Sequence, residues 1–247
     1  MQVIAQSDII MEVLDSRFWR ETRNTEFEKE IKKQKKKIIF VMSKSDLVDR
    51  KKTIKDMGEN NLYPFVFVSA KYRKGSKELM QRIKIESRKI NKDKIYVGVV
   101  GYPNTGKSSI INMLRGSSIT RVSSESGFTK GMQKVRITDK ILLIDTPGVI
   151  PISEDSNTKD RDLLKHALIN TRTWDKIREP ESIVHELMQK YPGVLEEFYN
   201  IPADGDSDIL LENLGRKKSL LLKKNEVDYD KTARLILRDF QEGKIKV

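Results

Sequence analysis

Short apolar runs, rich in β-branched residues, alternate with helical patterns over the first 150 residues. Strands that alternate with helices favour an α/β fold, in which helices cover both faces of a doubly wound, mostly parallel sheet. The predicted strands are residues 8–14, 37–42, 65–68, 95–100, 134–137 and 141–144, and the helices between them are residues 25–36, 46–57 and 76–90, capped by Thr25, Asp46 and Ser76.

The hydrophobic pattern changes near residue 150. Residues 151–160 are polar and predict a linker between a first domain, residues 1–150, and a second domain, residues 161–247. In the second domain the apolar spacing predicts only helices, and in the last of them a single apolar stripe runs from Tyr229 to Phe240. We therefore expect a small all-α C-terminal domain, with helices at residues 160–168, 181–190, 206–213 and 228–241.

Composition narrows the classes of partner and site. Lys and Arg outnumber Asp and Glu by 48 to 36, and the net charge of +12 favours a polyanionic partner such as RNA, DNA or an anionic membrane, or simply a well-solvated surface. The chain has no cysteine, which excludes disulfides, and two histidines are too few for a histidine-based metal cluster. No apolar run approaches the roughly 18 residues of a membrane span, and the start lacks a signal-peptide pattern. We expect a cytoplasmic protein without membrane segments.

The sequence Gly-Tyr-Pro-Asn-Thr-Gly-Lys-Ser at residues 101–108 matches the Walker A spacing of a phosphate-binding P-loop. Glycines let backbone N–H groups form a nest for phosphates, and the following helix adds its positive N-terminal end. Lys107 would supply a point charge to the β- and γ-phosphates, and the Ser108 hydroxyl would ligate Mg²⁺. The predicted phosphate-binding residues are Asn104, Thr105, Gly106, Lys107, Ser108 and Ser109.

A second phosphate motif follows the strand at residues 141–144. Asp145 of the sequence Asp-Thr-Pro-Gly can hold Mg²⁺ through water, and the Gly148 N–H can meet the γ-phosphate. Thr129, in a loop rich in Ser and Gly, can supply a second hydroxyl to the metal. Taken singly, each pattern is equally typical of an ordinary turn or a solvated loop. Together they predict a Mg²⁺ site made by Ser108, Thr129 and Asp145.

Two further loops predict the choice of base. Ser43-Lys44-Ser45-Asp46 resembles the N-K-x-D motif, in which a carboxylate accepts hydrogen bonds from guanine N1–H and the exocyclic amine, a pair that adenine does not offer. The Lys44 stem would pack over the base, with its head linked to the P-loop backbone. Because Ser43 replaces Asn and reaches less far, we expect looser affinity for the same base. The sequence Ser69-Ala70-Lys71 resembles the S-A-K motif, whose backbone N–H meets guanine O6.

Both base motifs precede the P-loop, whereas in ordinary GTPases they follow it. This order predicts a circular permutation, which a fold tolerates when the original termini lie close together. It also sends the segment after Gly148 directly into the C-terminal domain. We therefore expect the state of the γ-phosphate to influence that domain, as in GTPase switches.

With these motifs in this order, the chain resembles the YlqF/RbgA family of circularly permuted ribosome-assembly GTPases. Val-Leu-Asp-Ser-Arg at residues 13–17 is similar to the family's V-x-D-A-R segment, and residues 210–215 and 228–244 resemble its C-terminal helical domain. Bacterial members carry an N-terminal histidine, whereas here no histidine precedes His166, so the resemblance is to an archaeal or divergent member. It implies a GTPase that assists assembly of the large ribosomal subunit and binds ribosomal RNA.

The resemblance also implies a mechanism. Gly148 is followed by Val149 and Ile150, where a Ras-like enzyme has the glutamine that orients the attacking water. Asn104 matches the P-loop residue that helps to hold K⁺ in potassium-activated relatives, where the cation neutralises developing charge. Asn104 can equally stabilise the loop alone. We expect slow intrinsic hydrolysis of GTP to GDP, faster with K⁺ or a ribosomal partner, through Lys107, Asn104, Thr129 and Gly148.

We hypothesise that basic residues of the C-terminal domain bind RNA, since Lys and Arg contact phosphates in a salt-dependent way. A solvated helix face is the alternative for such a charge run. Two other functions stay open, a P-loop ATPase or kinase and a non-catalytic scaffold that binds GTP or GDP, and we expect a monomer. The candidate RNA-binding residues are Arg216, Lys217, Lys218, Lys223, Lys224, Lys231, Arg234 and Arg238.

Overall fold

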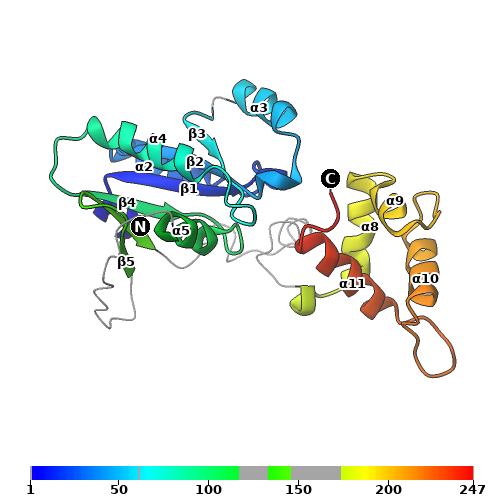
Figure 1. Cartoon of the computed structure of the whole chain (residues 1–247). Coiled ribbons are helices and arrows are strands. Elements are labelled where there is room, and N and C mark those ends of the chain that lie inside the picture. The colour runs from blue at the N-terminus through cyan, green and yellow to red at the C-terminus, as the bar shows by residue number, and fades with distance from the viewer. Residues whose placement is uncertain (1, 61, 117–132, 146–173, 247) are drawn as a thin grey trace. The chain divides into compact units, whose positions relative to one another are not determined.

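The chain divides into two compact units, Met1–Ser156 and Asn157–Val247. The computed structural model (Figure 1) describes residues 2–60, 62–116, 133–145 and 174–246. In those ranges no helix combines the length and the apolar composition that crossing a bilayer requires. The predicted helix at residues 160–168 lies outside the described residues.

The described part of the first unit contains one six-stranded sheet in the order β3-β2-β1-β4-β6-β5. Its strand pairs are parallel except for β5 and β6, which are antiparallel. Every predicted strand is present with bounds that differ by no more than one residue, so the predicted mostly parallel sheet is confirmed. The strands are β1 (Ile9–Asp15), β2 (Lys37–Ser43), β3 (Phe65–Phe67), β4 (Ile95–Val100), β5 (Gln133–Arg136) and β6 (Ile141–Asp145).

Helices cover both faces of this sheet. Along β1, Ile9, Met11 and Val13 belong to the apolar cluster that includes α4 (Ser76–Arg88) and α5 (Lys107–Gly116). The alternate residues Ile10 and Leu14 face the other side, because successive side chains of a strand point to opposite faces. That side is covered by α1 (Gln2–Gln6), α2 (Thr25–Lys33) and α3 (Arg50–Glu59). The doubly wound arrangement is therefore confirmed.

The helix caps differ from the prediction by one to three residues. Asn24, not Thr25, caps α2, because its Oδ1 accepts a hydrogen bond from the Phe27 N–H at 3.0 Å. Asp49, not Asp46, caps α3, and α4 begins after Gly75 rather than after Ser76. Asp46 lies instead in a short 3-10 turn, Ser45–Leu47, directly after β2.

In its described part the second unit is helical. Its elements are a 3-10 turn (Trp174–Lys176), α8 (Pro180–Lys190), α9 (Val194–Tyr199), α10 (Ser207–Lys217) and α11 (Tyr229–Gln241). Helix α11 packs against both α8 and α10, and its residues Ala233, Ile236, Leu237 and Phe240 are buried as the apolar stripe predicts. Tyr229, at the start of the stripe, is instead 36% exposed, and its hydroxyl donates to Glu212. The six-residue helix α9 was not predicted.

Candidate nucleotide-binding site

The carboxyl ends of the parallel strands bring the predicted motifs to one edge of the sheet. Asp15 of β1 pairs with Ser43 of β2, so the base-motif loop begins beside the end of β1. Asp145 of β6 pairs with Val99 of β4, two residues before the P-loop. Helices α2 and α5 leave β1 and β4 towards opposite faces, and ligands of α/β sheets bind in the crevice at such a switch point.

The P-loop has the backbone that its glycines allow. Gly101 has φ +143°, and a Cβ at this position would lie 2.5 Å from the Val13 carbonyl oxygen of β1. Gly106 has φ +98°, and Asn104 also has a left-handed backbone, with φ +59°. The Thr105 hydroxyl donates to the Tyr102 carbonyl at 2.9 Å. The loop therefore closes on itself between β4 and α5.

Lys107 is buried inside this curl. Its Nζ donates to the Tyr102 carbonyl oxygen at 2.5 Å, and the residue is only 6% exposed. An ammonium carries three donors, so a lysine anchored in this way can also reach a phosphate that enters the loop. Ser108 and Ser109, in the first turn of α5, are exposed.

Ser43 joins the base motif to the P-loop. Its hydroxyl lies 2.6 Å from the carbonyl oxygen of Thr105, a residue 62 positions later in the chain. It lies 2.9 Å from the Leu14 carbonyl as well, and the two acceptors share the single hydroxyl hydrogen. Serine thus reaches the P-loop in spite of its short side chain. The predicted effect of Ser43 on affinity stays a prediction.

Lys44 does not make the predicted link to the P-loop backbone. Its Nζ instead pairs with Asp15 Oδ2 at 2.7 Å, and the Arg17 guanidinium pairs with the same carboxylate at 2.9 Å. Burial alone would raise the pKa of Asp15, but the hydrogen bond and charge of Arg17, and then those of Lys44, outweigh it and hold that pKa below its usual range. Asp15 is therefore a carboxylate that fixes both cations.

The segment of residues 13–17 thus supports the base loop, a role that motif spacing alone did not reveal. Besides the ion pairs of Asp15, the Ser16 hydroxyl donates to the Ser43 carbonyl at 2.5 Å. The sequence signal was the resemblance of this segment to V-x-D-A-R. An aspartate at the end of a buried strand, two residues before an arginine, could have been recognised as a carboxylate that holds neighbouring cations in place.

The two base loops are tied together through the backbone. The Ser45 N–H donates to the Val68 carbonyl at 3.2 Å, which joins the first base loop to the end of β3. Ser69 is buried and exchanges two backbone hydrogen bonds with Lys74, both 3.0 Å long. Other residues of these loops reach solvent. Asp46 and Ala70 are half-buried, and Lys71 is exposed.

The residues predicted to hold Mg²⁺ are described only in part. Thr129 and Gly148 lie outside the described residues, and of Asp145 only the backbone is described. A hydroxyl at the start of α5 and a carboxylate at the end of β6 are oxygen donors on one edge of the sheet, which suits this hard cation. Ser108 and Asp145, with Thr129, would hold it. The metal would neutralise charge that develops between the β- and γ-phosphates.

The candidate RNA-binding residues of the second unit fall into two groups. Arg216 pairs with Glu212, Lys217 donates to the Tyr199 carbonyl, and Arg234 binds both Asp230 and the Trp174 carbonyl. Arg238 lies 5.9 Å from the centre of the Trp174 ring. Lys217, Arg234 and Arg238 thus contact other elements of the unit, whereas Arg216 pairs within its own helix. The other four, Lys218, Lys223, Lys224 and Lys231, are exposed, as are Arg216 and Lys217.

Comparisons with known proteins agree with this geometry. The sequence model of a family described as "50S ribosome-binding GTPase" matches residues 96–200. An uncharacterized GTP-binding protein of Methanocaldococcus jannaschii is 38% identical over 247 residues, which cover 99% of this chain and 64% of that protein. Nucleolar GTP-binding protein 2 of Saccharomyces cerevisiae is 33% identical over 99% of this chain and 51% of its own length. The chain thus spans about half to two thirds of these relatives.

Solved structures match the fold over almost the whole chain. GNP-bound YlqF from T. maritima aligns with a TM-score of 0.68 at 20% identity, covering 98% of this chain and 91% of that one. The GDP-bound form gives 0.69 at 20% identity, with 98% and 93% covered. At this identity the likeness establishes the fold. With the permuted motif order and the GTP-binding relatives, it confirms the predicted resemblance of the chain to the YlqF family of circularly permuted P-loop proteins.

Proposed function

We propose that the chain hydrolyses GTP to GDP and phosphate and serves as a switch in assembly of the large ribosomal subunit. The observation that carries the proposal is the contact of the Ser43 hydroxyl with the Thr105 carbonyl, which joins a guanine-type loop to a phosphate-type loop. The matching family's description as 50S ribosome-binding, and the relatives named nucleolar GTP-binding proteins, support the ribosomal partner.

Asp46 selects the base in this proposal. Its carboxylate accepts from the two N–H donors on the guanine edge, whereas xanthine presents one donor and one carbonyl oxygen there. Asp46→Asn offers one acceptor and one donor, so it should weaken GTP binding and strengthen xanthosine triphosphate binding, each by about 100-fold. Titration with fluorescent GTP, ATP and xanthosine triphosphate measures this. An ATP affinity equal to that for GTP, or a variant with no gain for xanthosine triphosphate, would refute the base assignment.

Hydrolysis depends on Lys107 and on the metal ligands. Slow turnover follows because Val149 and Ile150 offer no polar group to orient water. Asn104 would help to hold a K⁺ ion, whose positive charge near the phosphates would accelerate the reaction. Phosphate release measured in K⁺ and in Na⁺, with wild type and Asn104→Ala, separates this role from loop support. Equal rates in the two salts would remove K⁺ from the mechanism.

The ribosomal partner is tested by co-sedimentation with large subunits in the GTP and GDP forms. We expect association to depend on the nucleotide, because the segment after Gly148 connects the phosphate site to the second unit. Phosphate release should rise when subunits are added to the monomeric protein. A protein that binds nucleotide and subunits but releases no phosphate is a scaffold, which is the alternative function.

A further inference from the structure

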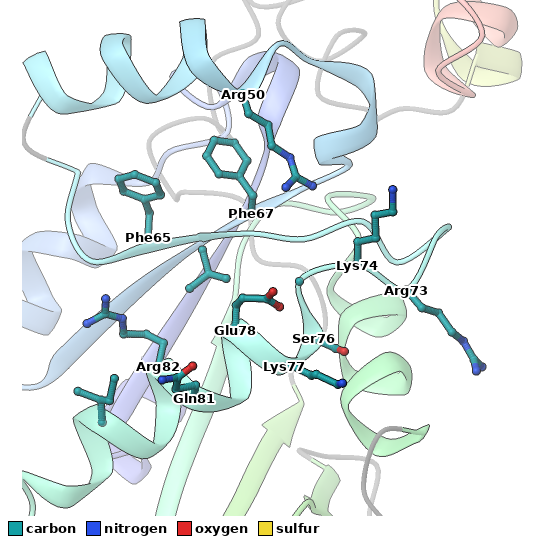
Figure 2. Close-up of a pocket in the computed structure, with 13 residues that line it drawn as sticks. Arg50, Phe65, Phe67, Arg73, Lys74, Ser76, Lys77, Glu78, Gln81 and Arg82 are labelled. Atoms are coloured by element: carbon teal, nitrogen blue, oxygen red, sulfur yellow. The ribbon is translucent and has the colours of Figure 1, made fainter.

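A cavity of about 720 Å³ opens at the edge of the sheet formed by β3. Figure 2 shows Phe65 and Phe67 on one side of the β3 ribbon and Gln81 and Arg82 of α4 on the other. The lining residues come from β3, from the start of α3, and from the segment that leads into α4 and its first turns. They belong to neither the base motifs nor the P-loop, although Arg50 and Lys74 are hydrogen-bonded to Ser45 and Ser69, so this cavity adjoins the nucleotide site without being part of it.

The cavity is strongly basic. Among the described residues that line it, Glu78 is the acidic side chain, against five basic ones. A concave surface with charge of one sign raises the local concentration of oppositely charged ligands. The five basic residues are Arg50, Arg73, Lys74, Lys77 and Arg82.

Planar groups lie beside these charges. The rings of Tyr63, Phe65 and Phe67 form a series of edge-to-face contacts, with centroids 6.5 Å and 5.7 Å apart. The Arg50 guanidinium lies 5.6 Å from the centre of the Phe67 ring, and the Arg82 guanidinium lies 5.6 Å from that of Tyr63. Tyr63 is 69% exposed. Nucleobases stack on exposed aromatic rings and on guanidinium planes, and their phosphates bind nearby cations.

We propose that this cavity binds a single-stranded segment of RNA, with phosphates on Arg73, Lys74 and Lys77 and a base against Tyr63. Its volume is within the range of roughly 300–1,000 Å³ for small-ligand sites, which fits one or two nucleotides and is too small for a duplex. An acidic peptide would use the cations but leave the aromatic faces without a partner. The inference rests on the ribosomal partner of the proposed function, which contains RNA, and adds a contact in the first unit.

The charge test uses the full chain and a fluorescein-labelled single-stranded RNA of about 12 nucleotides, which is long enough to fill the cavity and to extend along the surface on either side. The cavity variant is Arg73→Ser/Lys74→Ser/Lys77→Ser, and Arg50 and Arg82 are kept because they contact Ser45 and Glu86. The matched control, Lys29→Ser/Lys32→Ser/Lys33→Ser, removes equal charge from exposed positions of α2 in the same unit. GTP affinity, expected unchanged in both, verifies that each variant is folded.

We expect the cavity variant to bind RNA at least about 10-fold more weakly, with the slope of log affinity against log salt smaller by about 2, since each phosphate contact on a single strand contributes roughly 0.7. The control should lose no more than about twofold, because exposed charges at a distance are screened. Equal losses in both variants would mean that only net charge matters and would overturn the proposal.

The aromatic test is Tyr63→Ala against Tyr72→Ala. The Tyr63 ring adjoins the cavity through its contacts with the lining residues Phe65 and Arg82, whereas Tyr72, also exposed at 56%, has its ring beside Lys71, which does not line the cavity. Loss of one stacked base should weaken binding about fivefold or more in the first variant alone. Unchanged RNA binding, or a loss seen only for a polyglutamate peptide, would contradict a nucleic-acid site.

A loss confined to Lys218→Ser/Lys223→Ser/Lys224→Ser would overturn this inference yet leave the proposed function standing. A wild-type protein that binds GTP but no RNA would refute this inference and the RNA role of the proposed function together.

Discussion

The middle and the end of strand β1 each bury a carboxyl group, and the two groups respond in opposite ways. Glu12 is completely buried, and its Oε1 accepts a hydrogen bond from the Asn24 N–H at 2.7 Å. Burial raises its pKa to about 8, against the opposing effect of the Asn24 N–H, with a small further rise from Glu28. Asp15, three residues later, is 2% exposed, but Arg17 and Lys44 keep its pKa below the usual range.

The difference lies in the partners rather than in the degree of burial. A neutral N–H offsets part of the cost of burying a charge, whereas two cations within hydrogen-bonding distance offset more than all of it. Glu12 therefore carries a proton near neutral pH, and Asp15 is ionised. The ionised group is the one at the carboxyl end of the strand, where the base loop begins. The protonated group lies deeper, beside Val100 of β4.

The largest effect is expected from Asp15→Asn, which removes the carboxylate and leaves both cations without it. Breaking a buried ion pair by removing one partner costs about 3–5 kcal/mol, so the free energy of unfolding should fall by that amount. GTP affinity should fall as well, because Lys44 loses the partner that positions it. Urea unfolding and titration with fluorescent GTP measure the two effects.

A matched control for this change is Asp56→Asn, which alters the ion pair of Asp56 with the more exposed Arg20. Exposed pairs contribute about 0–1 kcal/mol, so this variant should remain close to wild type in stability and in GTP affinity. If Asp15→Asn were no worse than Asp56→Asn, the buried Asp15 carboxylate would contribute no more than a partly exposed ion pair, and its cations would not offset its burial.

The second effect concerns pH. Because the folded pKa of Glu12 is about 8 and the ordinary value is 4.5, the folded state holds a proton that the unfolded state has lost between these pH values. Stability from this group is complete below the unfolded pKa and falls as pH rises towards 8, by at most about 1.4 kcal/mol per pH unit. The contribution of Asp15 has the opposite sign, because it is present above the unfolded pKa and is lost in acid.

Glu12→Gln tests this prediction, since an amide keeps the shape and the acceptor but cannot ionise. At pH 8 the variant should be more stable than wild type by about 4 kcal/mol, and at pH 4.5 the two should be nearly equal. Urea unfolding at a series of pH values between these limits measures the slope. Parallel curves for variant and wild type would show that Glu12 does not titrate in this window.

Sequence periodicity and motif order were enough to predict the sheet, the P-loop and their order in the chain. Apolar runs such as residues 95–100 are too short and too rich in β-branched residues to be anything but strands, and the P-loop spacing is rarely met by chance. The same periodicity did not reveal Glu12 as a buried acid, because a single polar residue in an apolar run does not change the pattern.

Features that depend on tertiary contact were not predictable. Asp49 rather than Asp46 caps α3 because β2 is followed by a 3-10 turn, and no short-range rule distinguishes the two aspartates. The partner of Lys44 comes from another strand, 29 residues earlier. The basic cavity at β3 gathers Arg50 with residues 73–82, which the sequence separates by an entire helix and a strand.

The smallest effect is expected at Ser43, where the end of β1 and the P-loop share one hydroxyl hydrogen. Ser43→Ala leaves the Leu14 and Thr105 carbonyls without this donor, which costs about 1 kcal/mol of stability. Because Thr105 belongs to the P-loop, GTP affinity should fall about fivefold as its position becomes less fixed. Ser43→Asn restores the N-K-x-D residue and a donor, and should bind GTP at least as tightly as wild type. Thermal unfolding and GTP titration of both variants measure these changes. If alanine and asparagine at position 43 weakened GTP binding equally, the loss would come from the changed side-chain volume. The hydrogen bond of the Ser43 hydroxyl would then not be what couples the base loop to the phosphate loop.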